Sequence, residues 1–300
     1  MLKIAEIKNI TRTAQELHIT QPTLSAFVHD VEEGLGAKIF DRSTNPLSLT
    51  FAGEKYIESA KKILLEYENL QKEIRDINNH MTGRLRIGTS RDRASFMLPK
   101  MLPVFCEKYP GIDVEIFTDS GQKLREALQD GRLDIVILPD TWQGMWKDFD
   151  FESHKIYSEE LVFVAKAGTI PEKFYRINEA GSKIIKPQAM KSMKFFLLFK
   201  EHAMRTFCDQ YFKKHNVKPE IKMQFSSNIT CYRMAAAGMG VTIVPFLTTQ
   251  MSDAGDEVET FSLDEKSVVW EVKGFYRKGA YIGEPELELM RIANGIFSRK

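Results

Sequence analysis

The chain has 300 residues, of which 43% are hydrophobic and 28% are charged, and its net charge is +1. These values describe a globular protein with ample material for a core, in one large domain or two ordinary ones, and they exclude a disordered or fibrous chain. No apolar run approaches the ~20 residues that span a bilayer, and charges interrupt the N-terminus, so we expect no membrane partner and no secretion. Three widely spaced cysteines favour reduced thiols and a cytoplasmic protein over a disulfide framework.

Residues 1–53 predict short helices followed by a hairpin. Thr11 is the predicted N-cap of a helix that carries Ala14 and Leu17 inward. A second helix follows after a tight turn. The stretch "KIFDR" then predicts a short strand, and "STNPLSL" predicts a hairpin that returns to Leu49. This order of elements is that of a winged helix-turn-helix.

The second helix is predicted over residues 20–35. Thr20 is its N-cap, Pro22 is tolerated in its first turn, and Gly36 provides the left-handed residue that ends it. Its apolar residues have the spacing i, i+3, i+4, i+7 and are Leu24, Phe27, Val28 and Val31. The opposite face is polar and nearly uncharged and contains Gln21, Thr23, Ser25, Ala26 and His29.

Such a face is able to read bases in the major groove through its N-terminal residues. Arg42 lies at the start of the wing and is expected to contact the phosphate backbone of DNA, together with Ser43 or Thr44. The predicted DNA-binding set is Thr20, Gln21, Pro22, Thr23, Ser25, Ala26, His29 and Arg42. The alternative is a small helical domain whose polar face is merely solvated. Residues 1–53 carry five basic and six acidic side chains, which is a poor footprint for phosphate binding.

A long helix is predicted from Thr50 to about Asn79, and residues 54–80 form its linker portion. Its apolar residues alternate in steps of four and three and are Tyr56, Ala60, Ile63, Tyr67, Leu70, Ile74 and Ile77. This narrow heptad seam predicts dimerisation, and the alternative is a helix docked on its own domain. The stretch "NNHMTG" predicts a hinge at the end of the helix.

From residue 84 the pattern alternates between strand and helix, which predicts an α/β domain over 84–300 with parallel strands. The strands fall into two sets, so we expect one lobe over about 84–160 and 268–300 and another over about 161–267. Two such lobes enclose a crevice at the carboxyl ends of their strands.

The chain resembles the LysR-type family of bacterial transcriptional regulators. The matching residues are, in order, Thr11, Arg12, Ala14, Leu17, Gln21, Pro22, Leu24, Ser25, Glu32, Leu35, Gly36, Phe40, Arg42, Leu49, Thr50 and Gly53. Similarity continues through "LPKMLPVFCEKYPGIDVEI", "LQDGRLDIVI" and "AAAGMGVTIVP".

The resemblance implies a winged helix-turn-helix, a dimerising linker helix and a two-lobed effector domain like that of periplasmic solute-binding proteins. It implies promoter DNA, a small metabolite, a second copy of the chain in a homodimer or homotetramer, and RNA polymerase as partners. Thr13 departs from the family pattern, as do the residues after Ser25, so A·T-rich sites with thymine methyl groups are the expected preference. Relatives also begin several residues earlier, so we expect a short first helix.

Three predicted strand–helix junctions offer hydroxyl groups and free N–H groups that can hold an anion. The expected effector is therefore a carboxylate or another small anion. The predicted effector-binding residues are Thr89, Ser90, Phe199, His202, Ser227 and Asn228. The alternative is that these side chains only cap helices.

The sequence contains no nucleophile motif, phosphate-binding loop or metal-ligand spacing, so we expect neither an enzyme nor a cofactor nor a metal site. Cys208 and Cys231 are expected to pack as small apolar groups, and Trp142, Trp146 and Trp270 as core or lobe-edge residues. A second functional reading is a cytoplasmic small-molecule binding protein whose DNA-binding head is weakened or vestigial.

Overall fold

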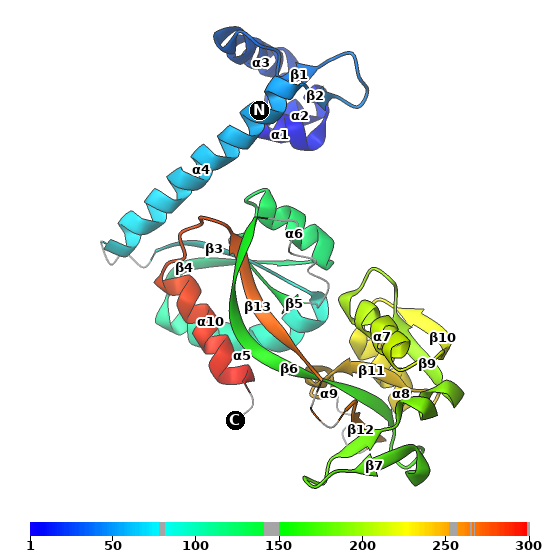
Figure 1. Ribbon diagram of the computed structural model, residues 1–300. Helices are drawn as coiled ribbons and strands as arrows, with labels where there is room; N and C mark the ends of the chain where they lie inside the picture. The colour runs from blue at the N-terminus through cyan, green and yellow to red at the C-terminus, as the bar shows by residue number, and fades with distance from the viewer. Residues whose placement is uncertain (78–81, 141–149, 252–256, 265, 267, 299–300) are drawn as a thin grey trace. The chain divides into compact units, whose positions relative to one another are not determined.

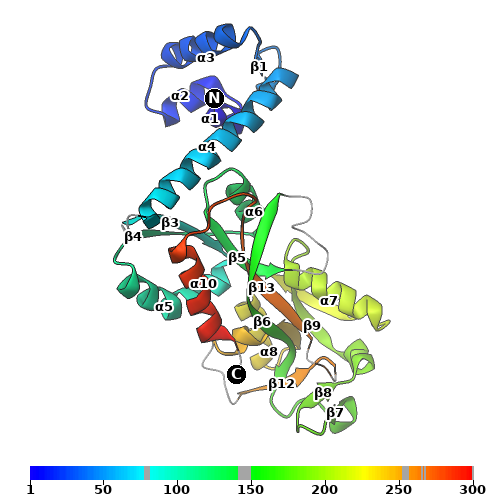
Figure 2. The same cartoon turned by 60° about the vertical axis from the view of Figure 1, so that its left-hand side comes forward.

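The computed structural model describes residues 1–77, 82–140, 150–251, 257–264, 266 and 268–298. Contacts divide the chain into an N-terminal unit, Met1–Ile77, and a C-terminal unit, Asn78–Lys300. Figures 1 and 2 show these units from two directions. The predicted hinge falls mostly on residues 78–81, and Trp142 and Trp146 fall on 141–149, so both predictions lie outside the described residues.

The N-terminal unit contains a winged helix-turn-helix, as the sequence predicts. Its elements are α1 (Leu2–Ile7), α2 (Ile10–Glu16), α3 (Gln21–Leu35), β1 (Phe40–Asp41), β2 (Ser48–Leu49) and α4 (Phe51–Ile77). The two strands pair antiparallel, with Phe40 opposite Leu49, and form the base of the wing. The helices enclose a core of Ile4, Ala14, Leu24, Val28, Ile39 and Phe40.

Two predictions for the first helices are wrong. Asn9, not Thr11, caps α2, because the Asn9 side chain accepts a hydrogen bond from the Arg12 N–H at 2.9 Å. Thr11 lies inside the helix. Leu17 is the C-cap residue of α2, and its side chain is 45% exposed rather than turned inward.

The limits of α3 agree with the prediction. The Thr20 hydroxyl accepts a hydrogen bond from the Thr23 N–H, and Gly36 ends the helix with φ of 65°. The predicted apolar face is wrong at Phe27, which is 51% exposed. The buried row of α3 has a spacing of four residues and comprises Leu24, Val28 and Glu32. Four residues exceed one helical turn only slightly, so this row follows one narrow side of the helix.

The start of α4 packs closely on the wing. Thr50 caps the helix, since its hydroxyl accepts a hydrogen bond from the Gly53 N–H at 3.0 Å. A Cβ atom on Gly53 would lie 2.0 Å from the carbonyl oxygen of Ile39. Only glycine therefore permits this approach of α4 to the chain that leads into β1.

The C-terminal unit has a mixed α/β fold organised around a nine-stranded sheet with the order β4-β3-β5-β13-β6-β12-β8-β7 and with β11 beside β6. The first lobe contains β3 (Thr82–Thr89), α5 (Arg91–Lys108), β4 (Gly111–Thr118), α6 (Gly121–Gln129), β5 (Ile135–Asp140) and α10 (Glu284–Phe297). Two strands continue from this lobe and are β6 (Phe151–Lys166) and β13 (Val269–Arg277).

The second lobe contains shorter elements on both sides of the far half of β6. They are η1 (Glu172–Phe174), β7 (Tyr175–Ile177), β8 (Lys183–Ile185), η2 (Pro187–Ser192), β9 (Lys194–Leu198), α7 (Ala203–Lys214), β10 (Glu220–Phe225), α8 (Asn228–Ala236), β11 (Thr242–Pro245), α9 (Phe246–Thr249) and β12 (Val258–Ser262). Strands β7, β8, β12 and β13 and helix α10 were not predicted from the sequence, and only the last third of β6 was.

The prediction of parallel strands holds only in part. Strand β3 pairs parallel with β4 and β5, and β10 pairs parallel with β9. Strand β6 instead pairs antiparallel with β13 up to Glu160, and with β11 and β12 from Leu161 onward. One continuous strand therefore passes through both lobes, which Figure 1 shows as the long green ribbon.

Three residues that were predicted from the sequence to pack in the interior, Cys208, Cys231 and Trp270, are buried in the structure. Cys208 and Cys231 are each 1% exposed, and burial raises the pKa of both thiols, that of Cys231 to about 12. Trp270 is also buried. These observations confirm the packing predictions for the three residues.

Candidate DNA-reading and effector sites

The N-terminal edge of α3 presents a polar surface. Gln21, Pro22, Thr23, Ala26 and His29 are exposed, and Ser25 is half-buried. The amide of Gln21 donates a hydrogen bond to the Ser25 hydroxyl at 2.8 Å, and the hydroxyls of Thr20 and Thr23 are 2.8 Å apart. These contacts hold four hydrogen-bonding side chains at the N-terminal end of the helix, the end with which recognition helices contact base edges.

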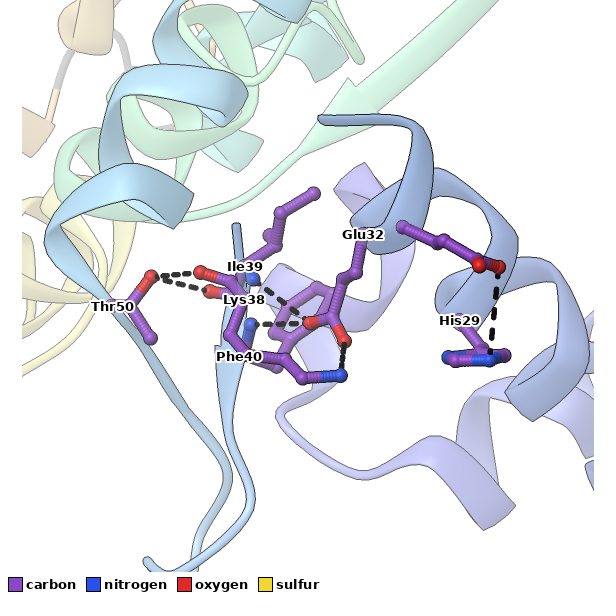
Figure 3. Close-up of polar contacts among 7 residues, drawn as sticks. His29, Glu32, Lys38, Ile39, Phe40 and Thr50 are labelled. Atoms are coloured by element: carbon purple, nitrogen blue, oxygen red, sulfur yellow. Dashed lines mark hydrogen bonds and ion pairs between the residues drawn. The ribbon is translucent and has the colours of Figure 1, made fainter. Parts of the chain in front are cut away.

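Glu32 connects α3 to the wing (Figure 3). One oxygen of its carboxylate accepts hydrogen bonds from the N–H groups of Ile39 at 2.8 Å and Phe40 at 3.1 Å. The other oxygen lies 3.1 Å from the ammonium group of Lys38. Burial alone would raise the pKa of Glu32, but the two backbone N–H groups and Lys38 hold it below its usual value. Glu32 therefore fixes the wing relative to the helix as an ionised side chain.

Most basic groups of the helix-turn-helix are engaged within the unit. Lys3 pairs with Glu6 and Glu16, Arg12 lies 3.9 Å from Glu16, and Lys38 pairs with Glu32. Arg42 is exposed on the wing and makes no ion pair with the described residues. Arg42 is therefore free to contact a phosphate group.

An apolar stripe runs along α4 beyond the helix-turn-helix. Five side chains on this stretch are 48–68% exposed and are Ile63, Leu64, Tyr67, Leu70 and Ile74. Four of them belong to the predicted seam, and the side chain of Ile77 lies outside the described residues. Among the described side chains of the N-terminal unit, these five remain exposed, which is what a helix that packs on a second helix would show.

The predicted effector residues lie at three strand ends in the C-terminal unit. Thr89 ends β3, but it is 2% exposed and its hydroxyl donates to the carbonyl oxygen of Ile137 at 2.8 Å. Ser90 is the N-cap residue of α5 and makes no side-chain capping bond. The Thr89 hydroxyl is thus committed to the sheet, whereas that of Ser90 is not committed to its helix.

The other two junctions are adjacent. Strands β9 and β10 are parallel neighbours, and the Phe199 N–H donates to the carbonyl oxygen of Phe225 at 2.9 Å. This contact places Phe199 and His202, the N-cap residue of α7, beside the junction that leads to Ser227 and α8.

Asp92, in the first turn of α5, joins the first lobe to this second-lobe junction. Both oxygens of the Asp92 carboxylate accept from the Ser227 hydroxyl, at 3.0 and 3.2 Å, and one accepts from the Asn228 N–H at 2.7 Å. The N-terminus of α8 therefore already holds a carboxylate, and it is one that the chain itself supplies. The amide oxygen of Asn228 is buried and has no hydrogen-bond partner among the described residues.

A buried polar cluster lies next to Asp92. Arg93 donates to Glu159 at 2.8 Å and to the hydroxyl of Tyr157, and the Trp270 indole N–H donates to Glu159 at 2.9 Å. Burial would lower the pKa of Arg93, but the charge of Glu159 raises it overall. The first turn of α5 is thereby tied to the two strands, β6 and β13, that continue between the lobes.

No group of three or more potential metal-ligating side chains occurs among the residues that the structure describes. Within the same residues, no helix combines the length and the apolar character needed to cross a bilayer.

Each of the two units matches the model of a known protein family. A model described as "Bacterial regulatory helix-turn-helix protein, lysR family" matches residues 1–54, and one described as "LysR substrate binding domain" matches residues 78–293. The chain belongs to the LysR family of transcriptional regulators. This LysR-type protein is thus a DNA-binding regulator with an effector-binding domain, and its family consists of regulators rather than enzymes. The match over the head gives no support to the reading of a ligand-binding protein with a vestigial DNA-binding domain.

Individual relatives are distant but extend over most of the chain. An uncharacterised HTH-type transcriptional regulator of Bacillus subtilis, YybE, is 27% identical over 245 residues, which cover 81% of this chain and 80% of YybE. The RuBisCO operon transcriptional regulator of Acidithiobacillus ferrooxidans is 26% identical over 268 residues, covering 88% of this chain and 82% of its own. A full-length OxyR variant from Pseudomonas aeruginosa has a similar fold, with a TM-score of 0.68, 22% identity and coverage of 98% of this chain and 94% of that chain.

The parts played by Glu32, Asp92 and Arg93 were not predicted from the sequence. A signal existed for Glu32, since it continues the four-residue spacing of Leu24 and Val28. None existed for Asp92, because its partners lie 135 and 136 residues away.

Proposed function

We propose that this LysR-type regulator binds double-stranded promoter DNA as a homodimer or homotetramer in the cytoplasm, under the control of a small anionic effector. The observation that carries the DNA-binding part is the exposed polar edge of α3, fixed beside the Arg42 wing by Glu32. The proposed contacts are those of Thr20, Gln21, Pro22, Thr23, Ser25, Ala26, His29 and Arg42.

Fluorescence anisotropy against duplexes from upstream of the regulator's own gene tests this proposal, with a shuffled duplex at the same salt concentration as the control. The variant Gln21→Ala is expected to reduce the preference for the native sequence. Arg42→Ala is expected to weaken binding to both duplexes and to lower the salt dependence. Arg12→Ala is the matched control, because Arg12 pairs with Glu16. Equal affinity of the wild type for both duplexes would contradict sequence-specific binding.

The exposed stripe on α4 supports the oligomeric part of the proposal. A heptad seam of this kind buries its apolar residues against a second helix. A second copy of the chain supplies a helix with the same seam. Light scattering during gel filtration should give the mass of a dimer or tetramer for the wild type and a lower mass for Leu70→Glu. Glu66→Lys, a charge change at an exposed position of the same helix, is expected to leave the mass unchanged.

The effector part rests on the N-terminus of α8, which binds a carboxylate group well enough to hold that of Asp92. Proposed contacts to the effector are those of Ser90, Ser227 and Asn228, with Phe199 and His202 at the neighbouring junction and Thr89 supporting the strand end. Titration calorimetry with a panel of small carboxylates, repeated with Ser90→Ala, tests this assignment. Absence of heat for every member, or binding that Ser90→Ala leaves unchanged, would contradict it.

A further inference from the structure

The N-termini of α5 and α8 meet at the carboxylate of Asp92. Asp92 lies in the first turn of α5, where a negative charge is favourable to its own helix. Its oxygens nevertheless bond to the first residues of α8, the Ser227 hydroxyl and the Asn228 N–H. One carboxylate therefore serves two helix ends that belong to different lobes.

The contact is positioned to join the lobes rather than to build either of them. Ser227 is already the cap of α8, because its hydroxyl accepts from the Thr230 N–H at 3.4 Å while it donates to Asp92. Helix α5 keeps Arg93, the next residue, in its buried pair with Glu159. Each helix thus has its own local anchoring, and the Asp92 bonds add a link between the lobes.

All three participants are only half-buried. Each of them therefore keeps some surface exposed to solvent, unlike the members of a fully enclosed ion pair. A dissolved carboxylate has the same acceptor geometry as Asp92 and can make the same bonds to the Ser227 hydroxyl and the Asn228 N–H.

We infer that Asp92 is a built-in latch, an internal carboxylate that occupies the anion position at α8 and holds the two lobes together until a dissolved anion replaces it. This inference rests on the proposed anionic effector, and it adds the element with which that effector competes. It predicts that the resting chain responds weakly to simple anions, and that removal of the Asp92 carboxylate exposes a site for them.

Hydrogen exchange of the full-length protein, read at the amides of Asn228 and Thr230, provides the test. In Asp92→Ala the Asn228 amide loses its acceptor, and its exchange rate should rise about tenfold or more. Sodium acetate at tens of millimolar should restore protection in Asp92→Ala but leave the wild type unchanged, while sodium chloride at equal ionic strength should do neither. Asp113→Ala, an equal loss of charge on the exposed side of β4, is the matched control and should keep the wild-type rate.

A second pair of variants keeps the test independent of the fold of Asp92→Ala. Ser227→Ala removes one donor to Asp92 from the other lobe but also the acceptor of the Thr230 N–H, so this comparison is read at the Asn228 amide alone. There the double variant should lose little more protection than Asp92→Ala, because the two residues share one interaction. Additive losses, unchanged exchange in Asp92→Ala, or failure of acetate to restore protection would each overturn the latch. These readouts require neither DNA nor the natural effector. If acetate restores protection in Asp92→Ala but the carboxylate panel gives no heat, the effector assignment fails and the anion position at α8 stands. If acetate does not restore protection, the latch fails whatever the panel shows.

Discussion

Two carboxylates that accept hydrogen bonds from backbone N–H groups differ in how deeply they are buried. Glu32 accepts from the N–H groups of Ile39 and Phe40 inside the helix-turn-helix, and it is 2% exposed. Asp92 accepts from the Asn228 N–H and the Ser227 hydroxyl between the lobes, and it is half-buried. Both carboxylates accept from backbone N–H groups, but the other donor is the Lys38 ammonium at Glu32 and the Ser227 hydroxyl at Asp92, and the surroundings of the two acceptors also differ.

The difference lies in what can replace each carboxylate. Glu32 bonds to residues seven and eight positions further along the chain, within a closed core, so no solute reaches its donors. Asp92 bonds to residues 135 and 136 positions away at an accessible junction. We therefore expect the first interaction to persist in the folded head, and we propose that a ligand exchanges with the second. Four predictions test this contrast.

The largest effect is expected for Glu32→Ala. This change leaves two backbone N–H groups without their acceptor, which should lower the free energy of unfolding of the head by about 2–4 kcal/mol. Chemical denaturation followed by circular dichroism measures the loss, and DNA affinity should fall with it because the wing is no longer fixed. The control is Glu33→Ala on the same helix, where the side chain is 75% exposed. Equal losses for both variants would contradict the assigned role of Glu32.

Acid should remove the Glu32 contribution. The pKa of Glu32 is lowered in the folded head from 4.5, so its stabilisation is fully present above about that pH and is lost as the pH falls through the lower folded value. Exchange protection at Ile39 and Phe40 should therefore decline below pH ~4.5 in the wild type. Glu32→Gln should start from lower protection and show a flatter pH dependence in that window. A wild-type profile as flat as that of the variant would argue against an ionised Glu32.

Acetate should distinguish the two sites directly. It should restore a melting temperature that is lowered by roughly 3–6 °C in Asp92→Ala, and leave that of Glu32→Ala unchanged. Differential scanning calorimetry in acetate and in chloride of equal ionic strength makes the comparison. Recovery of both variants would show that acetate acts on general stability and not on the junction at α8.

The smallest effect is expected at His29. Its imidazole lies 3.9 Å from Glu33, and both side chains are well exposed. His29→Ala should therefore change the stability of the head by no more than about 0.5 kcal/mol. Any larger change in DNA affinity would then report a contact with DNA rather than a weakened fold, and Glu33→Ala provides the matched loss of the same pair.

Local chemistry allowed part of this architecture to be predicted. The limits of α3 followed from Thr20 and Gly36, because capping depends on residues within one turn. Phe27 was misassigned, since helical spacing cannot show that the buried row continues to the charged Glu32 instead. The first part of β6 was missed because it is polar, and its pairing comes from β13, more than a hundred residues later.

In the proposed effector site, too, some residues could be predicted from local sequence and others could not. The strand ends that carry Ser90 and Ser227 could be predicted from the alternation of strands and helices. Asp92 could not, because an acidic residue in a first turn has an adequate local explanation as a partner of its own helix. Only the three-dimensional structure brings α8 within 2.7 Å of it.

Gly53 constrains the geometry with which the helix-turn-helix is joined to the long helix α4. A single methyl group at this position would collide with the Ile39 carbonyl at 2.0 Å, and backbone atoms have no alternative rotamer to adopt. The angle between α4 and the wing therefore depends on the absence of a side chain at Gly53. In a dimer built through α4, that angle would also govern the distance between the two recognition helices. The spacing of half-sites in an operator would thus depend on a residue outside the proposed DNA-binding set.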